Sequence, residues 1–254
     1  MARFGYAAKG VVYVVVGGLA LQAALGGGGG TTGGEGALRA IAGQPFGQVL
    51  LWLLALGLVG YALWRFVQGV LDVEDRGTDA EGLAVRGGFL ASGAVHGLLA
   101  VYAFGLVTGN GGGGGGGAQG ATAKVLAHPF GAWLVGLAGV AVIGYGLVAA
   151  HRAYTRKYRQ EVAFGRLDRR VQRGIDRAGR LGLAARAVVF GLIGVFLIRA
   201  AVQSNPAQAR GLEGALDTLA AQPHGPWLLG VVAVGLMAYG VWSMVKARYR
   251  VFRT

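Results

Sequence analysis

The sequence predicts an all-α, polytopic membrane protein whose six transmembrane helices form three tandem αα hairpins. Three observations support this prediction: apolar windows of spanning length, an internal repeat that occurs three times, and a one-sided distribution of lysine and arginine. The chain of 254 residues is 54% hydrophobic and 14% charged, and its mean hydropathy is +0.52. A soluble domain with a wetted surface rarely has this composition.

Six windows are long and apolar enough to cross a membrane, which takes about 20 apolar residues for a hydrocarbon core of about 30 Å. They are Gly5–Leu25, Phe46–Leu71, Arg86–Val107, Phe130–Ala150, Leu181–Val202 and Trp227–Val245. The first window has some features of a cleaved signal peptide. Because the same pattern returns twice later in the chain, we expect a retained helix instead.

The repeat is visible in two separate parts of each unit. The opening "RFGYAAKGVVYVVVG" aligns with "RGGFLASGAVHGLLA" at a shift of 83 residues and with "RLGLAARAVVFGLIG" at a shift of 177. The second halves align at shifts of 84 and 178 through "QPFG", "HPFG" and "QPHG". Each unit contains two spans, so the three units share one orientation, and we expect a pseudo-threefold axis along the membrane normal, that is, parallel repeats.

These alignments divide the chain into five parts. Repeat 1 covers residues 1–71, an acidic cytoplasmic linker covers 72–85, and repeat 2 covers 86–151. A basic amphipathic cytoplasmic helix is expected over 152–179, because Phe164, Leu167, Val171 and Ile175 recur at steps of three and four among many arginines. Repeat 3 and a basic C-terminal tail cover 180–254.

The connection inside each hairpin contains two recurring features. The segments "EGALRAIA" and "EGALDTLA" come just before Pro45 and Pro223 and predict one or two turns of interfacial helix. The Gly-rich runs near residues 26–30 and 111–117 match any glycine motif trivially, and neither run has the Gly-Lys-Ser/Thr of a phosphate loop. The third repeat has an unrelated sequence at the equivalent place in its hairpin. We therefore expect these runs to be flexible Gly-rich loops.

The positive-inside rule predicts the orientation. If both termini and the two segments between repeats lie on one side, 20 of the 24 basic residues lie there too. The remaining four are Arg39, Lys124, Arg199 and Arg210. We therefore expect a multi-pass protein of the bacterial inner (plasma) membrane with cytoplasmic N and C termini. This bias also explains the net charge of +13, so nucleic acid is not an expected partner.

Four segments carry a resemblance to a known family: "RFGYAAKGVVY", "GALRAIAGQPFG", "GYALWR" and "DRGTDAEGLAVRGGF". With these segments the chain resembles the bacterial integral-membrane family known as domain of unknown function 1206, and the resemblance covers essentially the whole chain. It implies three two-helix repeats and transfers no catalytic residue. The third unit departs from the pattern, with His224 in place of Phe and Ser243 in place of a late Arg.

The ring-bearing residues Tyr13, His96 and Phe190 occupy equivalent columns and form one candidate intramembrane site. His96 lies ten residues after Arg86 and therefore roughly 15 Å deep, near the midplane. Ionisable groups at this depth suggest a function, and a proton or solute site is one interpretation. The alternative is a neutral histidine that forms a hydrogen bond between helices.

Several cations are candidate contacts to lipid headgroups or to a protein partner. Lys9 and Arg186 lie in equivalent columns, and their long side chains can extend from the spans to the headgroups. Arg169, Arg170 and Arg173 lie in the basic segment, which we expect to contact anionic lipid on the cytoplasmic face. A protein partner or a homo-oligomer is a further expectation.

The sequence excludes more chemistry than it indicates. The chain has no cysteine, which rules out disulfides and thiolate catalysis, and no pattern indicates a catalytic residue, a cofactor or a metal site. A non-enzymatic membrane scaffold or accessory subunit that packs with protein or lipid partners is the leading prediction. The alternative is a small channel or carrier for an ion or small solute along the pseudo-threefold axis, and an enzyme acting on a lipid ranks third.

Overall fold

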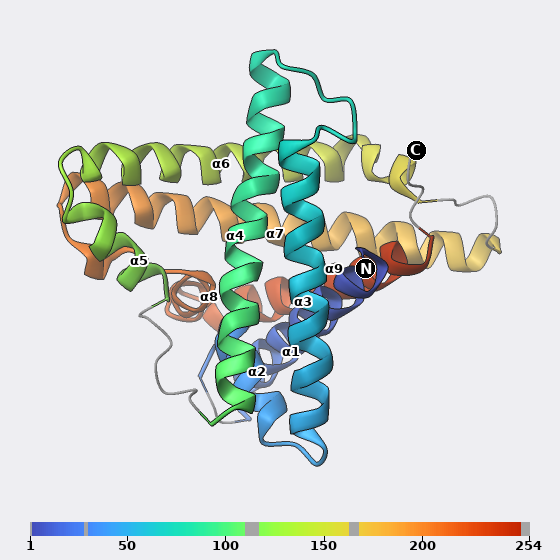
Figure 1. The fold of residues 1–254 in the computed structure, drawn as a ribbon. Coiled ribbons are helices and arrows are strands. Elements are labelled where there is room, and N and C mark those ends of the chain that lie inside the picture. The colour runs from blue at the N-terminus through green and yellow to red at the C-terminus, as the bar shows by residue number, and fades with distance from the viewer. Residues whose placement is uncertain (1, 28–29, 110–116, 163–167, 250–254) are drawn as a thin grey trace.

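The computed structural model describes residues 2–27, 30–109, 117–162 and 168–249 (Figure 1). Its long helices are α1 (Ala2–Ala24), α3 (Gly47–Val70), α4 (Ala80–Val107), α6 (Gly131–Thr155), α7 (Arg169–Val202) and α9 (Gly225–Tyr249). All six are long and apolar enough to cross a membrane. The predicted all-α fold with six spans is confirmed, and these helices make the chain a multi-pass membrane protein by length and composition.

Short helices occupy the connection inside each hairpin. They are α2 (Gly34–Ala42), α5 (Gly117–Leu126) and α8 (Leu212–Ala220), the last preceded by the 3-10 helix η3 (Pro206–Gln208), while a second 3-10 helix, η1 (Lys157–Glu161), lies between repeats 2 and 3. The predicted short helices before Pro45 and Pro223 are therefore present. Leu38 and Leu216 are fully buried in the main core, so α2 and α8 pack into the protein on their apolar side. Residues 28–29 and 110–116 of the predicted Gly-rich loops lie outside the described residues.

The same turn introduces the second long helix of every repeat. After the proline, one residue takes the left-handed conformation, with φ of 61° at Phe46, 63° at Phe130 and 62° at His224. The next residue is always glycine, because a Cβ at Gly47 would lie 2.4 Å from the Ile41 carbonyl oxygen. The repeated Pro-x-Gly signature thus encodes a tight reversal between the short helix and the span.

The long helices associate in three pairs, and each pair joins two different repeats. α1 packs on α9, α3 on α4 and α6 on α7, always antiparallel, and these are the most extensive contacts between described elements. The first helix of each repeat therefore packs on the second helix of another repeat, in the cyclic order expected of a pseudo-threefold arrangement. Figure 1 shows that the pairs cross, with α3 and α4 upright in the view and α6 and α7 running across it.

The linker between repeats 1 and 2 is more ordered than the sequence suggests. Asp79 caps α4 by accepting a hydrogen bond from the Gly82 amide at 3.0 Å, so residues 80–85 already belong to the span. Asp72 accepts from the amides of Arg76 and Gly77, both at 2.9 Å. The hydrogen bond from the Arg76 amide is the main cause of a lowered pKa of Asp72.

The basic segment differs from its prediction. A separate helix over 152–179 is expected from the sequence, whereas α6 runs to Thr155, η1 follows, and α7 runs without a break from Arg169 to Val202. Residues 163–167 lie outside the described residues. The amphipathic arginine-rich turns are thus the first part of a helix of 34 residues that continues into the span, because no proline separates them from the apolar part of the helix.

Tyr158 fixes η1 to the start of α7 and supports a prediction. Its buried hydroxyl donates to the Asp176 backbone oxygen at 2.8 Å and to the Asp176 carboxylate at 2.9 Å, and its ring packs edge-on against Trp242. Burial, followed by the Asp176 carboxylate, raises the pKa of Tyr158 to about 12. The neutral phenol is therefore favoured in the folded protein over the whole range below that value.

Tyr158→Phe is expected to lower the free energy of unfolding by about 1–3 kcal/mol at neutral pH, because hydrogen bonds to the backbone and to a carboxylate are lost. Since the folded pKa of Tyr158 is raised from 10.0 to about 12, its stabilisation is complete below pH 10 and is lost as pH rises toward 12. Thermal unfolding of both proteins across this range should show the difference between them shrinking. A constant difference would contradict this assignment.

Candidate functional site: a buried cation–tyrosine cluster

Basic side chains and tyrosines gather inside the protein, where the three helix pairs cross. We call this group the cation–tyrosine cluster. Its members are Lys9 and Tyr13 on α1, Tyr61 and Arg65 on α3, His96 on α4, Tyr145 on α6, Arg186 and Phe190 on α7, and Tyr239 and Lys246 on α9. Every long helix contributes, so the cluster exists only when all three repeats are assembled.

Tyr61 is the centre of one half of the cluster. Its hydroxyl, fully buried, accepts one hydrogen bond from the Lys9 ammonium and one from the Arg65 guanidinium, each at 2.8 Å. The Lys9 Nζ atom also lies 4.6 Å from the centre of the Tyr61 ring, and the Arg65 guanidinium lies 4.9 Å from the Phe89 ring. Tyrosine oxygens and ring faces thus provide the polar environment that these cations need inside the protein.

Arg186 is the centre of the other half. It donates to the Tyr239 hydroxyl at 2.7 Å and to the Tyr145 hydroxyl at 3.2 Å. The guanidinium lies 4.3 Å from the Tyr239 ring centre and 4.8 Å from that of Phe190. Its Nε atom is buried and has no hydrogen-bond partner among the described residues. Arg186 therefore keeps at least one buried donor that could bind a ligand.

The two halves are joined through rings that both cations approach. Lys9 and Arg186 each lie within 6 Å of the ring centres of Tyr13 and Tyr239. Lys246 adds a further buried cation, placed over the rings of Tyr6 and Trp242 at 5.1 and 5.9 Å. Lys9 and Arg186, which share two rings, are therefore close enough to act on a single ligand.

The cluster repeats the cyclic order of the helix pairs. Tyr13 packs on Tyr239, His96 on Tyr61 and Phe190 on Tyr145, with ring centres 4.8, 4.6 and 5.2 Å apart. The three ring-bearing residues predicted to be equivalent thus make equivalent contacts, each with the repeated tyrosine of another repeat. The Nδ1 atom of His96 lies 2.8 Å from the Ser92 oxygen of its own helix, so the described hydrogen bond is within α4 and does not join two helices.

Three cations of the cluster have no carboxylate partner among the described residues. No carboxylate of that part of the chain forms an ion pair with Lys9, Arg65 or Arg186. The nearest connection runs from Arg65 to Gln68 at 3.2 Å and then from Gln68 to Glu74 in the linker after α3. Glu74 also pairs with Arg76 at 2.9 Å. The interior of the cluster is therefore positively charged.

Lys9 and Arg186 are placed differently from the sequence prediction. The predicted extension to the headgroups requires exposed side chains, yet Lys9 is 2% exposed and Arg186 is 6% exposed. They turn inward because tyrosine hydroxyls and ring faces are available there and not at the helix surface. Arg169, Arg170 and Arg173 are exposed in the first turns of α7, and their contact with headgroups stays a prediction.

Two parts of the cluster are not among the sequence-predicted site residues. Arg65 and Lys246 count in the sequence only as cytoplasmic charges, and the tyrosines Tyr61, Tyr145 and Tyr239 only as interface or packing residues. A signal is nonetheless present: Arg65 lies four residues after Tyr61, and Lys246 lies seven after Tyr239. Both spacings place the cation on the helix face that carries the repeated tyrosine.

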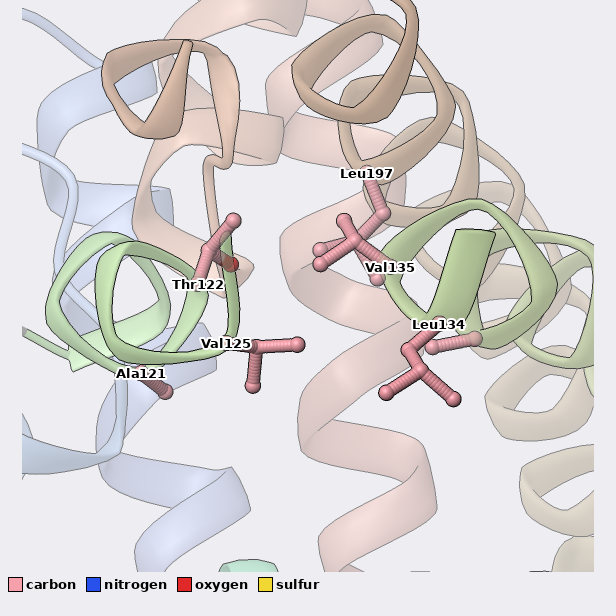
Figure 2. Close-up of a pocket in the computed structure, with 7 residues that line it drawn as sticks. Ala121, Thr122, Val125, Leu134, Val135 and Leu197 are labelled. Carbon is pink, nitrogen blue, oxygen red and sulfur yellow. The ribbon is translucent and has the colours of Figure 1, made fainter. Parts of the chain in front are cut away.

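An apolar cavity of about 270 Å³ lies apart from the cluster, between α5, α6 and α7 (Figure 2). Its lining residues are Ala121, Thr122, Val125, Leu134, Val135, Ala138 and Leu197. Val135 and Tyr145 are ten residues apart on α6, so about 15 Å separates the two places along the helix. Apart from the nearly buried Thr122, the cavity has no polar side chain, so the cluster offers more chemistry. Among the described residues, no three His, Asp or Glu side chains gather as metal ligands would.

Comparison with known proteins agrees with the three repeats. Residues 4–72, 87–156 and 181–250 each match the family described as Domain of Unknown Function (DUF1206). The chain is also 36% identical over 248 residues to the uncharacterised protein YxxB of Bacillus subtilis strain 168, covering 98% of this chain and 90% of that protein. No solved structure matches. The chain therefore belongs to the DUF1206 family of three-repeat membrane proteins.

Proposed function

We propose that this protein binds an anion inside the membrane, in the cation–tyrosine cluster where its three repeats meet. The observation that supports this proposal is the burial of Lys9, Arg65 and Arg186 without an ion-pair partner among the described carboxylates. A buried charge without a counter-charge costs several kcal/mol. A bound anion would supply the counter-charge and remove much of this cost.

The donors suit an oxyanion in particular. The Arg186 Nε atom is buried and lacks a partner among the described residues, and a guanidinium can bind two oxygens of a phosphate or carboxylate side by side. The Lys9 ammonium has three donors, and the described structure uses one of them, toward Tyr61. Tyrosine hydroxyls can reorient and donate to an anion as well.

Anion binding is compatible with both functions predicted from the sequence and distinguishes them by what happens to the bound anion. A protein that holds the anion permanently would be a membrane scaffold or accessory subunit with a lipid or protein partner, which is the leading prediction from sequence. A protein that releases it on the other side would be a small channel or carrier along the pseudo-threefold axis. We place the protein in the bacterial plasma membrane with cytoplasmic termini, as the lysine and arginine distribution suggests.

Inorganic phosphate is expected to raise the midpoint of thermal unfolding of the purified protein, because a ligand that binds only the folded state stabilises it. At a phosphate concentration 100 times the dissociation constant, the expected stabilisation is about 2.7 kcal/mol. The titration should be done in detergent at constant ionic strength and should saturate. Arg186→Gln should abolish the shift, while the same substitution at Arg199, an exposed arginine of the same helix, should leave it unchanged.

A midpoint that does not respond to phosphate, sulfate or a short-chain carboxylate in the unmodified protein would overturn the proposal. An equal response of the Arg186→Gln and Arg199→Gln variants would place the effect at the surface and would also overturn it. Liposomes that contain the protein then separate the two forms of the function. Anion flux that is lost in His96→Ala would identify a channel or carrier, and binding without flux would identify a scaffold or accessory subunit.

A further inference from the structure

Repeat 2 lacks the contact that closes the hairpins of the other two repeats. In repeat 1 a Cβ at Gly5 would lie 2.5 Å from the Tyr61 amide nitrogen, and in repeat 3 a Cβ at Gly182 would lie 2.5 Å from the Tyr239 Cα atom. At the equivalent Gly88 the nearest atom is 4.0 Å away, on the Tyr145 ring. Accordingly, α1 packs on α3 and α7 on α9, whereas α4 and α6 make no comparable interface within the described residues.

The sequence explains why this hairpin stays open. Four residues before the repeated tyrosine, repeats 1 and 3 have Gly57 and Gly235, and a Cβ there would lie 2.5 and 2.4 Å from the Cβ of Ala8 and of Ala185, respectively. Repeat 2 has Ala141 at this position. Its methyl group would collide with Ala91, the equivalent of Ala8, if α4 approached α6 as closely.

The open hairpin exposes positions that are buried elsewhere in the protein. Val95 on α4 is 62% exposed, while its equivalents Val12 and Val189 are 4% and 3% exposed. Tyr145 on α6 is 38% exposed, while Tyr61 and Tyr239 are 0% and 2% exposed. The exposed residues form one stripe at helical spacing on each helix, Ala91, Val95 and Leu98 on α4 and Ala141, Tyr145 and Val148 on α6.

The opening leads directly to the cation–tyrosine cluster. Tyr145 lies in the exposed stripe, and its hydroxyl accepts a hydrogen bond from Arg186 at 3.2 Å. Repeat 2 also lacks a cation of its own at the equivalent column, where Ser92 takes the place of Lys9 and Arg186. The cluster therefore reaches the opening at Tyr145, with Arg186 hydrogen-bonded directly behind it.

We infer that an anionic phospholipid enters between α4 and α6, with its phosphate at Arg186 and its acyl chains along the two apolar stripes. This inference rests on the proposed anion binding and names the ligand and its route. The route between two spans opens toward the bilayer, and its walls are alanine, valine and leucine apart from the Tyr145 ring. A soluble anion makes no favourable contact with apolar walls. A phospholipid has a negative headgroup for the cations of the cluster and acyl chains that can pack on the apolar stripes.

The depth of Arg186 is within reach of a lipid headgroup. Arg186 lies six residues after Arg180, the predicted cytoplasmic boundary of its span, so about 9 Å inside it along the helix. A phosphate must therefore move inward by less than two helical turns. The positive charge of Arg186 and Lys9 favours this movement, as other cations in membranes draw headgroups and water inward.

The test uses the full chain and native mass spectrometry with two phospholipids that share the same acyl chains, phosphatidylglycerol and phosphatidylcholine. The unmodified protein should retain the anionic lipid at least tenfold more strongly. Arg186→Gln should remove this preference, and the matched control Arg199→Gln, at an exposed arginine near the other end of α7, should keep it. Arg186→Lys preserves the charge and serves as the second variant if the glutamine variant fails to fold.

The route is tested by closing it. The chain has no cysteine, so Ala91→Cys combined with Ala141→Cys can form a single disulfide that ties α4 to α6. Oxidation should lower retention of phosphatidylglycerol at least tenfold, and reduction should restore it. Ala141→Gly, which removes the obstructing methyl group, should lower retention without a cross-link and is informative if the disulfide does not form.

Equal retention of the two lipids, or a preference that survives both Arg186→Gln and closure of the hairpin, would overturn this inference. Thermal stabilisation by inorganic phosphate that is lost in Arg186→Gln would show, in either case, that the anion site itself stands and that a soluble anion occupies it. Absence of both lipid preference and phosphate stabilisation would instead refute the proposed function. The two failures are therefore distinguishable.

Discussion

Lys9→Met is expected to stabilise the protein in the absence of ligand by about 1–4 kcal/mol, the range seen when buried ionic groups are replaced by apolar side chains of similar size. Lys9 is 2% exposed, has no ion pair with a described carboxylate, and lies near Arg186. Methionine fills the same unbranched volume without the charge. The free energy of unfolding, measured by denaturant or thermal titration in one detergent, checks the sign.

The contacts that Lys9→Met removes are weaker than the cost of the buried charge, which is why this substitution should stabilise the folded protein. Removing Lys9 costs its own hydrogen bond, about 0.5–1.5 kcal/mol, and its contacts with rings, about 0.5–2 kcal/mol. It leaves no buried group unsatisfied, because the Tyr61 hydroxyl still accepts from Arg65 at 2.8 Å. The cost of keeping an uncompensated charge in the interior exceeds these losses. The variant should also bind phosphate more weakly, so stability and binding should change in opposite directions.

Arg186→Met is the matched control, with the opposite outcome. Arg186 is the described hydrogen-bond partner of both the Tyr145 and the Tyr239 hydroxyl. Its loss leaves two polar groups without that donor, at about 1–3 kcal/mol each. We therefore expect this variant to be at least about 2 kcal/mol less stable than Lys9→Met. If Lys9→Met is as destabilising as Arg186→Met, the interior charge is compensated and the anion-binding proposal loses its basis.

The sequence was sufficient for the fold because the fold depends on patterns that extend over many residues. Span length, the repeated Pro-x-Gly turn and the shifts between repeats all survive local variation. The boundaries of the cytoplasmic segments depend on single residues instead. Asp79 caps α4 six residues before the predicted span, and the helix that begins at Arg169 continues into the third repeat. Charge alone does not predict either boundary.

The site was harder to predict than the fold, because counting the charges on each side of the membrane does not show which charged side chains are buried. The positive-inside count includes Lys9, Arg65, Arg186 and Lys246, all of which are buried. Pairing between different repeats places them inward, and the sequence alignment shows equivalence between repeats without showing which helices touch. The sequence does predict that Tyr61 and Arg65, four residues apart, lie on one face of their helix. Its neighbours Lys9 and Arg186 come from other helices, so the cluster itself required the structure.

The equivalent glycines Gly182 and Gly88 differ in how closely the second helix of the hairpin approaches them, and this difference can be measured as protein stability. Gly182→Ala is expected to destabilise the protein by about 1–3 kcal/mol, since overpacking has this cost where the surroundings cannot move. The new Cβ would lie 2.5 Å from the Tyr239 Cα atom and 2.6 Å from its backbone nitrogen. Because these are backbone atoms of a packed helix, α7 and α9 would have to separate, and the hydrogen bond from Arg186 to Tyr239 would lengthen.

Gly88→Ala is the matched substitution in repeat 2, and it should not destabilise the protein, because alanine is favoured over glycine inside a helix by about 0.5–1 kcal/mol. Its Cβ would meet only the edge of the Tyr145 ring at 4.0 Å, an ordinary van der Waals distance. Unfolding curves of the two alanine variants, measured side by side, therefore report directly on the asymmetry between repeats. Equal destabilisation would mean that α4 and α6 close in the folded protein as the other hairpins do, and the lateral opening would then be refuted. A large effect at Gly182 with none at Gly88 would establish that the second hairpin stays apart, since the two glycines occupy one column and differ only in how closely the partner helix approaches.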